Sequence, residues 1–203
     1  MKNRTNVRWL TQIALLAAIL LVLNYTPLGY LQVGPLSASL LTVPVAIGAI
    51  TMGPAAGALL GALFGATSFL QALQGKSVMG GALFAASPAG YFVVSVIGRV
   101  LMGLCVGLIF AALQKALPKK EKLTCYIAAF CAPFLNTVFY MGLLVAIFYN
   151  SEFVQNLAVK KGATNPLMFI VLVVGVQAVI EWCVCCAVAG TIALPVRKYM
   201  KNN

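Results

Sequence analysis

Two charged residues of this sequence, Arg99 and Glu181, lie deep inside long apolar stretches. An ionised side chain at the centre of a membrane costs at least ~2.5–3.5 kcal/mol on insertion scales, so such residues usually serve a function. A guanidinium group can bind the carboxylate of an anionic ligand through two parallel hydrogen bonds. Glu181 could orient Arg99 or contact a ligand hydroxyl or amide. Alternatively, the two residues could form a buried structural ion pair.

Neutral polar residues are expected at a similar depth. Gln177 lies four residues from Glu181 and therefore on the same helix face, and Ser95 and Tyr91 are spaced in the same way from Arg99. The candidate substrate-binding residues are Gln71, Tyr91, Ser95, Arg99, Asn136, Tyr140, Gln177 and Glu181. Together they predict a small polar cavity for a small ligand, because no ring of repeated charges indicates an ion channel. Each could instead form an isolated hydrogen bond between helices.

Other chemistry has little support in the sequence. Histidine, the commonest metal ligand and general base, does not occur. The spacing in Cys183-x-Cys185-Cys186 is not that of a zinc site. Gly75-Lys76-Ser77 resembles the end of a phosphate-binding loop, but Leu70 occupies the position where that motif needs its first glycine. We therefore expect no catalytic residues, no metal and no cofactor.

The composition indicates which elements must position these residues. The chain has 203 residues, 62% of them hydrophobic and 8% charged, against about 45–50% and 25% in soluble domains. This excess indicates an integral membrane protein and excludes a soluble enzyme or a nucleic-acid-binding domain. A span needs ~20 apolar residues, so we expect an all-α protein, one compact domain over residues 1–203 with six transmembrane helices. The expected spans are Trp9–Asn24, Ala38–Met52, Pro54–Leu73, Ala89–Gln114, Leu123–Phe148 and Leu167–Leu194, with Pro195 ending the last and loops at 25–37, 74–88 and 149–166.

The basic residues predict the orientation in the membrane. Ten of the fourteen Lys and Arg residues lie near the N-terminus, in residues 115–122, or near the C-terminus. Because cytoplasmic loops carry the excess of Lys and Arg, we expect a multi-pass protein of the cell membrane with both termini in the cytoplasm. Lys76, Lys160 and Lys161 would then lie outside, on the side where a ligand is met.

Small residues recur at helical spacing in three of the expected spans. Gly53, Gly57, Gly61 and Gly65 repeat every fourth residue, as do Gly103 and Gly107. Such stripes let helices approach closely in lipid, and we expect these glycines to pack inside the bundle. Ala14 and Ala18 form a similar stripe in the first span, which could face either a partner protein or the rest of the bundle.

These features resemble the substrate-binding (S) components of energy-coupling factor (ECF) transporters, over essentially the whole chain. The resemblance rests on six short spans, on Ala14-x-x-x-Ala18, on residues 26–34 and 42–49, and on Met52-Gly53-Pro54-Ala55-Ala56-Gly57. Within the family, Phe64-Gly65-Ala66-Thr67-Ser68-Phe69 is most similar to the pantothenate-type members.

The resemblance implies a transport protein without its own ATPase site. It would bind a vitamin, pantothenate by preference, from outside, and then topple in the lipid against a coupling transmembrane subunit driven by two cytoplasmic ATPase subunits. Ala14 and Ala18 would dock on that coupling subunit. Three alternatives remain: another vitamin, a stand-alone carrier of a small anionic metabolite that uses Glu181 for proton coupling, and a membrane protein without a ligand.

Overall fold

The computed structural model describes residues 2–33 and 36–202 and confirms the all-α membrane class. Among these residues, five helical stretches are long and apolar enough to cross a membrane: Val7–Tyr25, Pro54–Leu73, Pro88–Ala116, Glu121–Phe148 and Pro166–Met200. The helices are α1 (Lys2–Tyr25), α2 (Thr42–Met52), α3 (Pro54–Leu73), α4 (Val78–Ala86), α5 (Pro88–Phe92), α6 (Gly98–Ala116), α7 (Glu121–Phe148), α8 (Glu152–Lys161) and α9 (Pro166–Asn202). A 3-10 turn, η1 (Pro27–Gly29), and a π-helical turn, η2 (Val93–Ile97), complete the helical part.

The second predicted span is shorter than expected. The helix α2 has 11 residues, and nine of them are buried, so it lies inside the bundle and is too short to cross a membrane alone. Gly53, with φ of 93°, separates α2 from α3. Pro54 occupies the start of α3, where its missing N–H costs nothing.

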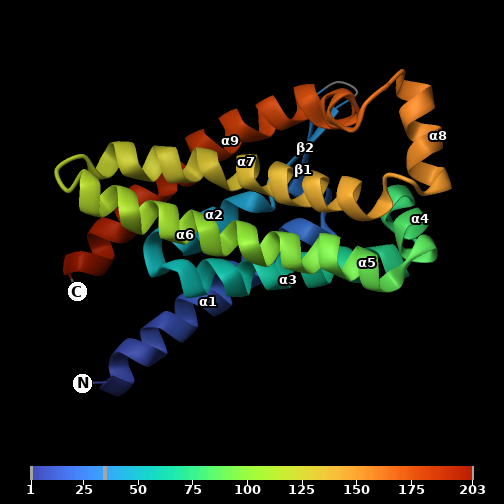
Figure 1. Ribbon diagram of the computed structural model, residues 1–203. Coiled ribbons are helices and arrows are strands. Elements are labelled where there is room, and N and C mark those ends of the chain that lie inside the picture. Colours follow the sequence, from blue (N-terminus) through green and yellow to red (C-terminus); the bar gives the residue numbers. More distant parts are fainter. Residues whose placement is uncertain (1, 34–35, 203) are drawn as a thin grey trace.

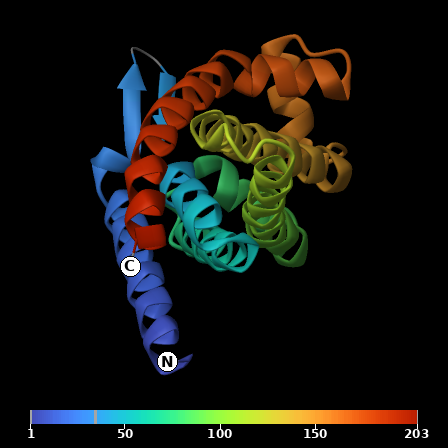
Figure 2. The same ribbon diagram turned by 90° about the vertical axis from the view of Figure 1, so that its left-hand side faces the viewer.

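The predicted loop before α2 is in part a β-hairpin. Strands β1 (Tyr30–Val33) and β2 (Leu36–Ser39) pair antiparallel, with Tyr30 opposite Ser39. Residues 38 and 39, which were expected in the second span, therefore belong to a strand. This hairpin stands beside α9 in Figure 2.

Two further predicted loops contain short helices. In α4, the Ser77 side chain accepts a hydrogen bond from the Gly80 amide and caps the helix start. Ser151 precedes α8, and Gly162, at φ 70°, ends it in the left-handed conformation. The Ser77 cap begins α4, in a segment where local helix was considered within the loop, and Gly162 ends α8, which was expected to be a loop.

The last helix does not end at Pro195, contrary to expectation. It continues to Asn202, and the reason is tertiary. Arg197 Nε donates to Glu121 Oε1 at 2.9 Å and Nη1 to the Ile50 carbonyl at 2.8 Å. These contacts hold the turns that follow Pro195 against α7 and α2.

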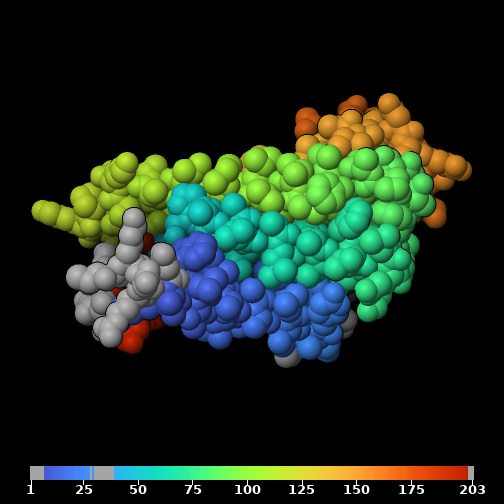
Figure 3. Space-filling model, turned by 90° about the horizontal axis from the view of Figure 1, so that it is seen from below, coloured from blue at the N-terminus to red at the C-terminus, as the bar shows by residue number. Residues whose placement is uncertain are grey.

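The helices α3, α6 and α7 run side by side along the long direction of the molecule (Figure 1). Both described ends of the chain and the α6–α7 connection lie at one end, whereas α4, α5 and α8 lie at the other (Figure 1). Seen from below, α1 covers part of the outer surface beside α3 (Figure 3). The predicted basic clusters therefore share one end of the molecule.

Glycines bring α3 and α6 into main-chain contact, as predicted. A Cβ added to Gly57 would overlap the Gly103 carbonyl, and a Cβ on Gly103 would overlap the Gly57 carbonyl. Gly61 lies in the same way against the Arg99 carbonyl, and Gly65 against Ser95. This contact fixes the part of α6 that carries Arg99 relative to α3.

Candidate functional site

The Arg99 guanidinium lies close to two aromatic rings. Its Cζ atom is 4.2 Å from the centroid of the Phe64 ring on α3 and 4.9 Å from that of Tyr140 on α7. Cation–π attraction of this kind contributes roughly 0.5–2 kcal/mol, most where water is excluded. The two rings therefore restrict the orientation of the planar group.

The π-helical turn η2 also positions Arg99. Ser95 belongs to this widened turn, and its carbonyl accepts a hydrogen bond of 2.8 Å from Arg99 Nη1. The Ser95 hydroxyl is completely buried and donates to the Tyr91 carbonyl at 2.7 Å. Ser95 therefore contributes its main chain to the site, whereas the sequence suggested its hydroxyl. Such single π turns occur frequently at functional sites.

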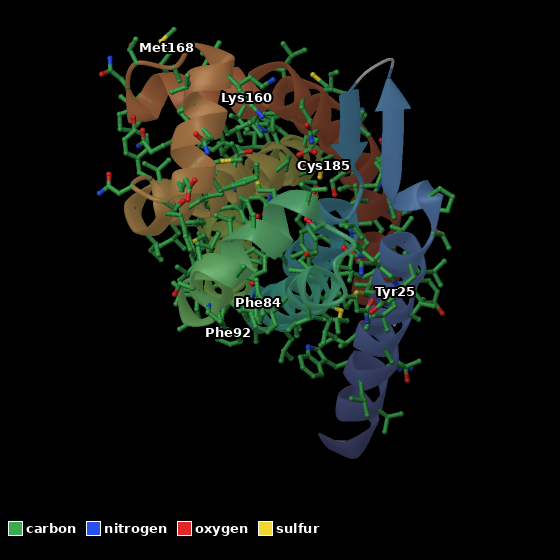
Figure 4. The ribbon with its side chains drawn as sticks, turned by 90° about the vertical axis from the view of Figure 1, so that its right-hand side faces the viewer. Tyr25, Phe84, Phe92, Lys160, Met168 and Cys185 are labelled. Atoms are coloured by element: carbon green, nitrogen blue, oxygen red, sulfur yellow. The ribbon has the colours of Figure 1, made fainter. Side chains whose placement is uncertain are left out.

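Tyr140 and Tyr91 connect Arg99 to an aromatic cluster. The Tyr140 side chain lies close enough to Tyr91 to interact with it, and Tyr91 stacks on Phe69 with ring centroids 5.9 Å apart. Phe69 also meets Phe84 and Phe92 edge-on, each at 5.6 Å. Figure 4 shows Phe84 and Phe92 close together near the end that carries α4 and α5. Aromatic rings therefore surround the candidate site on the side that faces α4 and α5.

Glu181 is buried and holds the hairpin to α9. Its Oε1 accepts a hydrogen bond from the Ser39 amide at 2.8 Å and from Gln177 Nε2 at 3.2 Å. Arg99 lies close enough to interact with this carboxylate electrostatically. The predicted pairing of Gln177 with Glu181 on one helix face is therefore observed, and the hydrogen bonds of the carboxylate go to Ser39 and Gln177.

The remaining two predicted residues are placed differently. Asn136 on α7 has a buried Oδ1 atom without a hydrogen-bond partner among the described residues. Gln71 donates from Nε2 to the Asn24 carbonyl at 3.0 Å and thereby ties α3 to α1. Asn136 thus offers an acceptor inside the protein, whereas Gln71 is engaged at the interface between two helices.

Sequence reasoning missed Phe64 and Ser39. A signal for Phe64 was available, because it adjoins Gly65 in the stripe that must approach the helix of Arg99. No signal pointed to Ser39, since its contribution is a main-chain amide on a strand that was expected to be a loop or helix. Aromatic rings, a guanidinium, a carboxylate and an amide oxygen together can bind a small anion that also carries hydrogen-bond donors.

The small-residue stripe of α1 lies on the surface. Ala14 and Ala18 are both exposed, and the share of residues buried along Val7–Tyr25 is 11%, below that of the other membrane-length stretches. The stripe is thus accessible to another helix.

Comparison with known proteins gives one family. The family model described as "ECF transporter, substrate-specific component" matches residues 8–193 of the chain. The search of curated proteins gives no match.

Proposed function

Since the chain belongs to the family of ECF transporter substrate-specific components, we propose that it binds a small vitamin carboxylate, pantothenate by preference. The family consists of transport proteins rather than enzymes, and its members bind a small-molecule substrate and work with an ECF module. The membrane-length helices agree with this assignment.

The observation that carries the proposal is the orientation of Arg99. Its Cζ atom lies 4.2 Å from the centroid of the Phe64 ring and 4.9 Å from that of Tyr140, so in this proposal a ligand approaches along the edge of the guanidinium. A carboxylate suits that edge, because it can accept two parallel hydrogen bonds from a planar guanidinium. Lysine offers no such fork.

The Asn136 amide oxygen and the Glu181 carboxylate could accept hydrogen bonds from the rest of the ligand. Pantothenate carries hydroxyls and an amide beside its carboxylate. The buried Oδ1 of Asn136 has no donor among the described residues, so a ligand hydroxyl or amide N–H would satisfy it. Glu181 and Gln177 offer further polar atoms next to the hairpin. In this proposal Tyr91, Ser95 and Gln71 position their neighbours.

The partners follow from the same proposal. The protein would dock through Ala14 and Ala18 on the coupling transmembrane subunit, which two ATPase subunits drive. Both termini and the α6–α7 connection would lie in the cytoplasm, and the end with α4, α5 and α8 would lie outside. The proposal includes no catalytic residue and no resident cofactor.

A binding titration tests the role of Arg99. Pantothenate is titrated against the purified protein, the Arg99→Ala variant and the Arg99→Lys variant, with thermal stability measured beside each. A hydrogen bond to a charged group contributes about 1.5–3 kcal/mol, so Arg99→Ala should weaken binding about 10- to 100-fold. Arg99→Lys should recover part of this loss. Glu181→Gln should be milder, because the remaining amide oxygen can still accept from Ser39.

The matched control is pantothenol, which has an alcohol in place of the carboxylate. It should bind the parent protein weakly and should respond little to Arg99→Ala. Full pantothenate affinity in folded Arg99→Ala protein would remove the anion site. No pantothenate binding, with another vitamin retained in the purified protein, would replace the substrate but leave the family assignment intact.

A further inference from the structure

A pocket of about 380 Å³ lies at the end of the molecule opposite the Arg99 site, where α2, α3, α6 and α9 meet. Its walls are mainly apolar and include Ile50, Pro54, Phe110 and Ala111, and its charged lining residues are Lys115 and Arg197. Within the described part of the chain, no acidic side chain lines this pocket. We propose that it binds the phosphate group of an anionic phospholipid, with the start of an acyl chain along the apolar wall.

Arg197 is oriented for this role. Glu121 accepts from its Nε atom and the Ile50 carbonyl from Nη1, and its Cζ lies 4.5 Å from the centroid of the Phe110 ring. These contacts fix the guanidinium at the pocket, which Arg197 lines. Glu121 neutralises part of the charge, so Lys115 supplies the second positive charge that an anionic headgroup requires.

The main chain of the pocket supports an anion as well. The pocket reaches Gly53 and Pro54 at the start of α3, a helix of 20 residues without a side-chain cap. The first N–H groups of a helix carry partial positive charge and lack partners within the helix. They add to the field of Lys115 and Arg197.

The location of the pocket in the molecule favours a lipid as the source of the phosphate. The pocket lies at the end with both termini and the basic α6–α7 connection, between the short helix α2 and three helices of membrane-spanning length, α3, α6 and α9. Basic pockets between transmembrane helices on the cytoplasmic side bind anionic headgroups. A mainly apolar wall suits an acyl chain and does nothing for a free phosphate ion. This inference is independent of which vitamin the protein binds.

The experiment measures lipid retention by native mass spectrometry and the unfolding temperature in detergent. The probes are dioleoyl-phosphatidylglycerol, dioleoyl-phosphatidylcholine and inorganic phosphate. We expect one phosphatidylglycerol molecule to be retained and to raise the unfolding temperature, with little effect of the other two probes. Since a basic residue near the surface contributes ≈ 1 kcal/mol to anionic-lipid binding, Lys115→Gln should lower retention about 5-fold.

Two pairs of variants distinguish the pocket from general surface charge and shape. Ala111→Trp should fill the pocket and abolish retention, whereas Ala112→Trp, at an exposed position that does not line it, should not. Lys119→Gln is the charge control for Lys115→Gln.

Three results would overturn the proposal. The first is equal retention of the two lipids, or equal losses in the control variants. The second is equal stabilisation by inorganic phosphate, which would indicate a soluble anion. In the third, Ala111→Trp blocks assembly with the coupling subunit while lipid retention persists, which would indicate a protein interface. None of these outcomes depends on vitamin binding, so failure here is distinguishable from failure of the proposed substrate.

Discussion

Replacing Gly103 by alanine should separate two helices that touch through their main chains. The added Cβ would overlap the carbonyl group of Gly57 and approach the Ala58 amide nitrogen. Main-chain atoms cannot rotate away, so α3 and α6 must move apart by about 1 Å to restore ordinary contact distances. A gap of that size forfeits a quarter to a half of the dispersion energy of the affected atom pairs.

The expected cost follows from that separation. Overpacking in a well-packed core costs about 1–3 kcal/mol, and lost contacts along the helix pair add to it, so we expect a loss of about 3 kcal/mol in the free energy of unfolding. The same displacement would move Ser95 and Arg99, whose carbonyls meet Gly65 and Gly61. Ligand affinity should therefore fall together with stability.

The assay is denaturant-induced unfolding of the purified protein in detergent. Gly142→Ala is the matched control, since a Cβ at Gly142 has no neighbour within 4 Å and the change should gain up to about 1 kcal/mol from helix propensity. If Gly103→Ala proves as stable as Gly142→Ala, the main-chain contact between α3 and α6 is not what holds these helices together.

Two further predictions concern orientation and docking. In a cysteine-free background, a cysteine at position 160 should react with an impermeant maleimide from outside, and one at position 119 only after the membrane is opened; the opposite pattern would invert the topology. Ala14→Trp should block assembly with the coupling subunit and leave vitamin affinity unchanged, because a bulky ring prevents close helix approach. Leu15→Trp, at a neighbouring exposed position, is its control, and equal effects of the two variants would exclude a specific stripe.

Much of the helical framework was predictable because the apolar stretches are long and their boundaries are clear. The glycine spacing indicated that these stripes pack inside the bundle, and the similar depth of Arg99 and Glu181 indicated that the two residues could meet. The hairpin was not predicted, because the glycines and prolines of residues 25–37 indicated a loop. The continuation of α9 past Pro195 depends on Arg197 and Glu121, which are 76 residues apart, and such a long-range pair leaves no local pattern.

Sequence reasoning also predicted which side chains lie near one another better than it predicted their contacts. Arg99, Tyr140, Gln177 and Glu181 were identified by residue type and depth. The Ser39 amide and the Ser95 carbonyl were not, because main-chain groups have no identity in a sequence.

The length of α9 has a consequence for the surrounding bilayer. Its exposed apolar residues extend from Leu167 to Ile192, a distance of about 38 Å at ~1.5 Å per residue, whereas the hydrocarbon core is ≈ 30 Å thick. Either this helix tilts by about 40°, at the upper end of the range seen for membrane helices, or the lipid beside it thickens. Bilayers of longer acyl chains would relieve this hydrophobic mismatch and favour an upright α9. Acyl-chain length is therefore expected to bias the orientation of the whole molecule in the membrane.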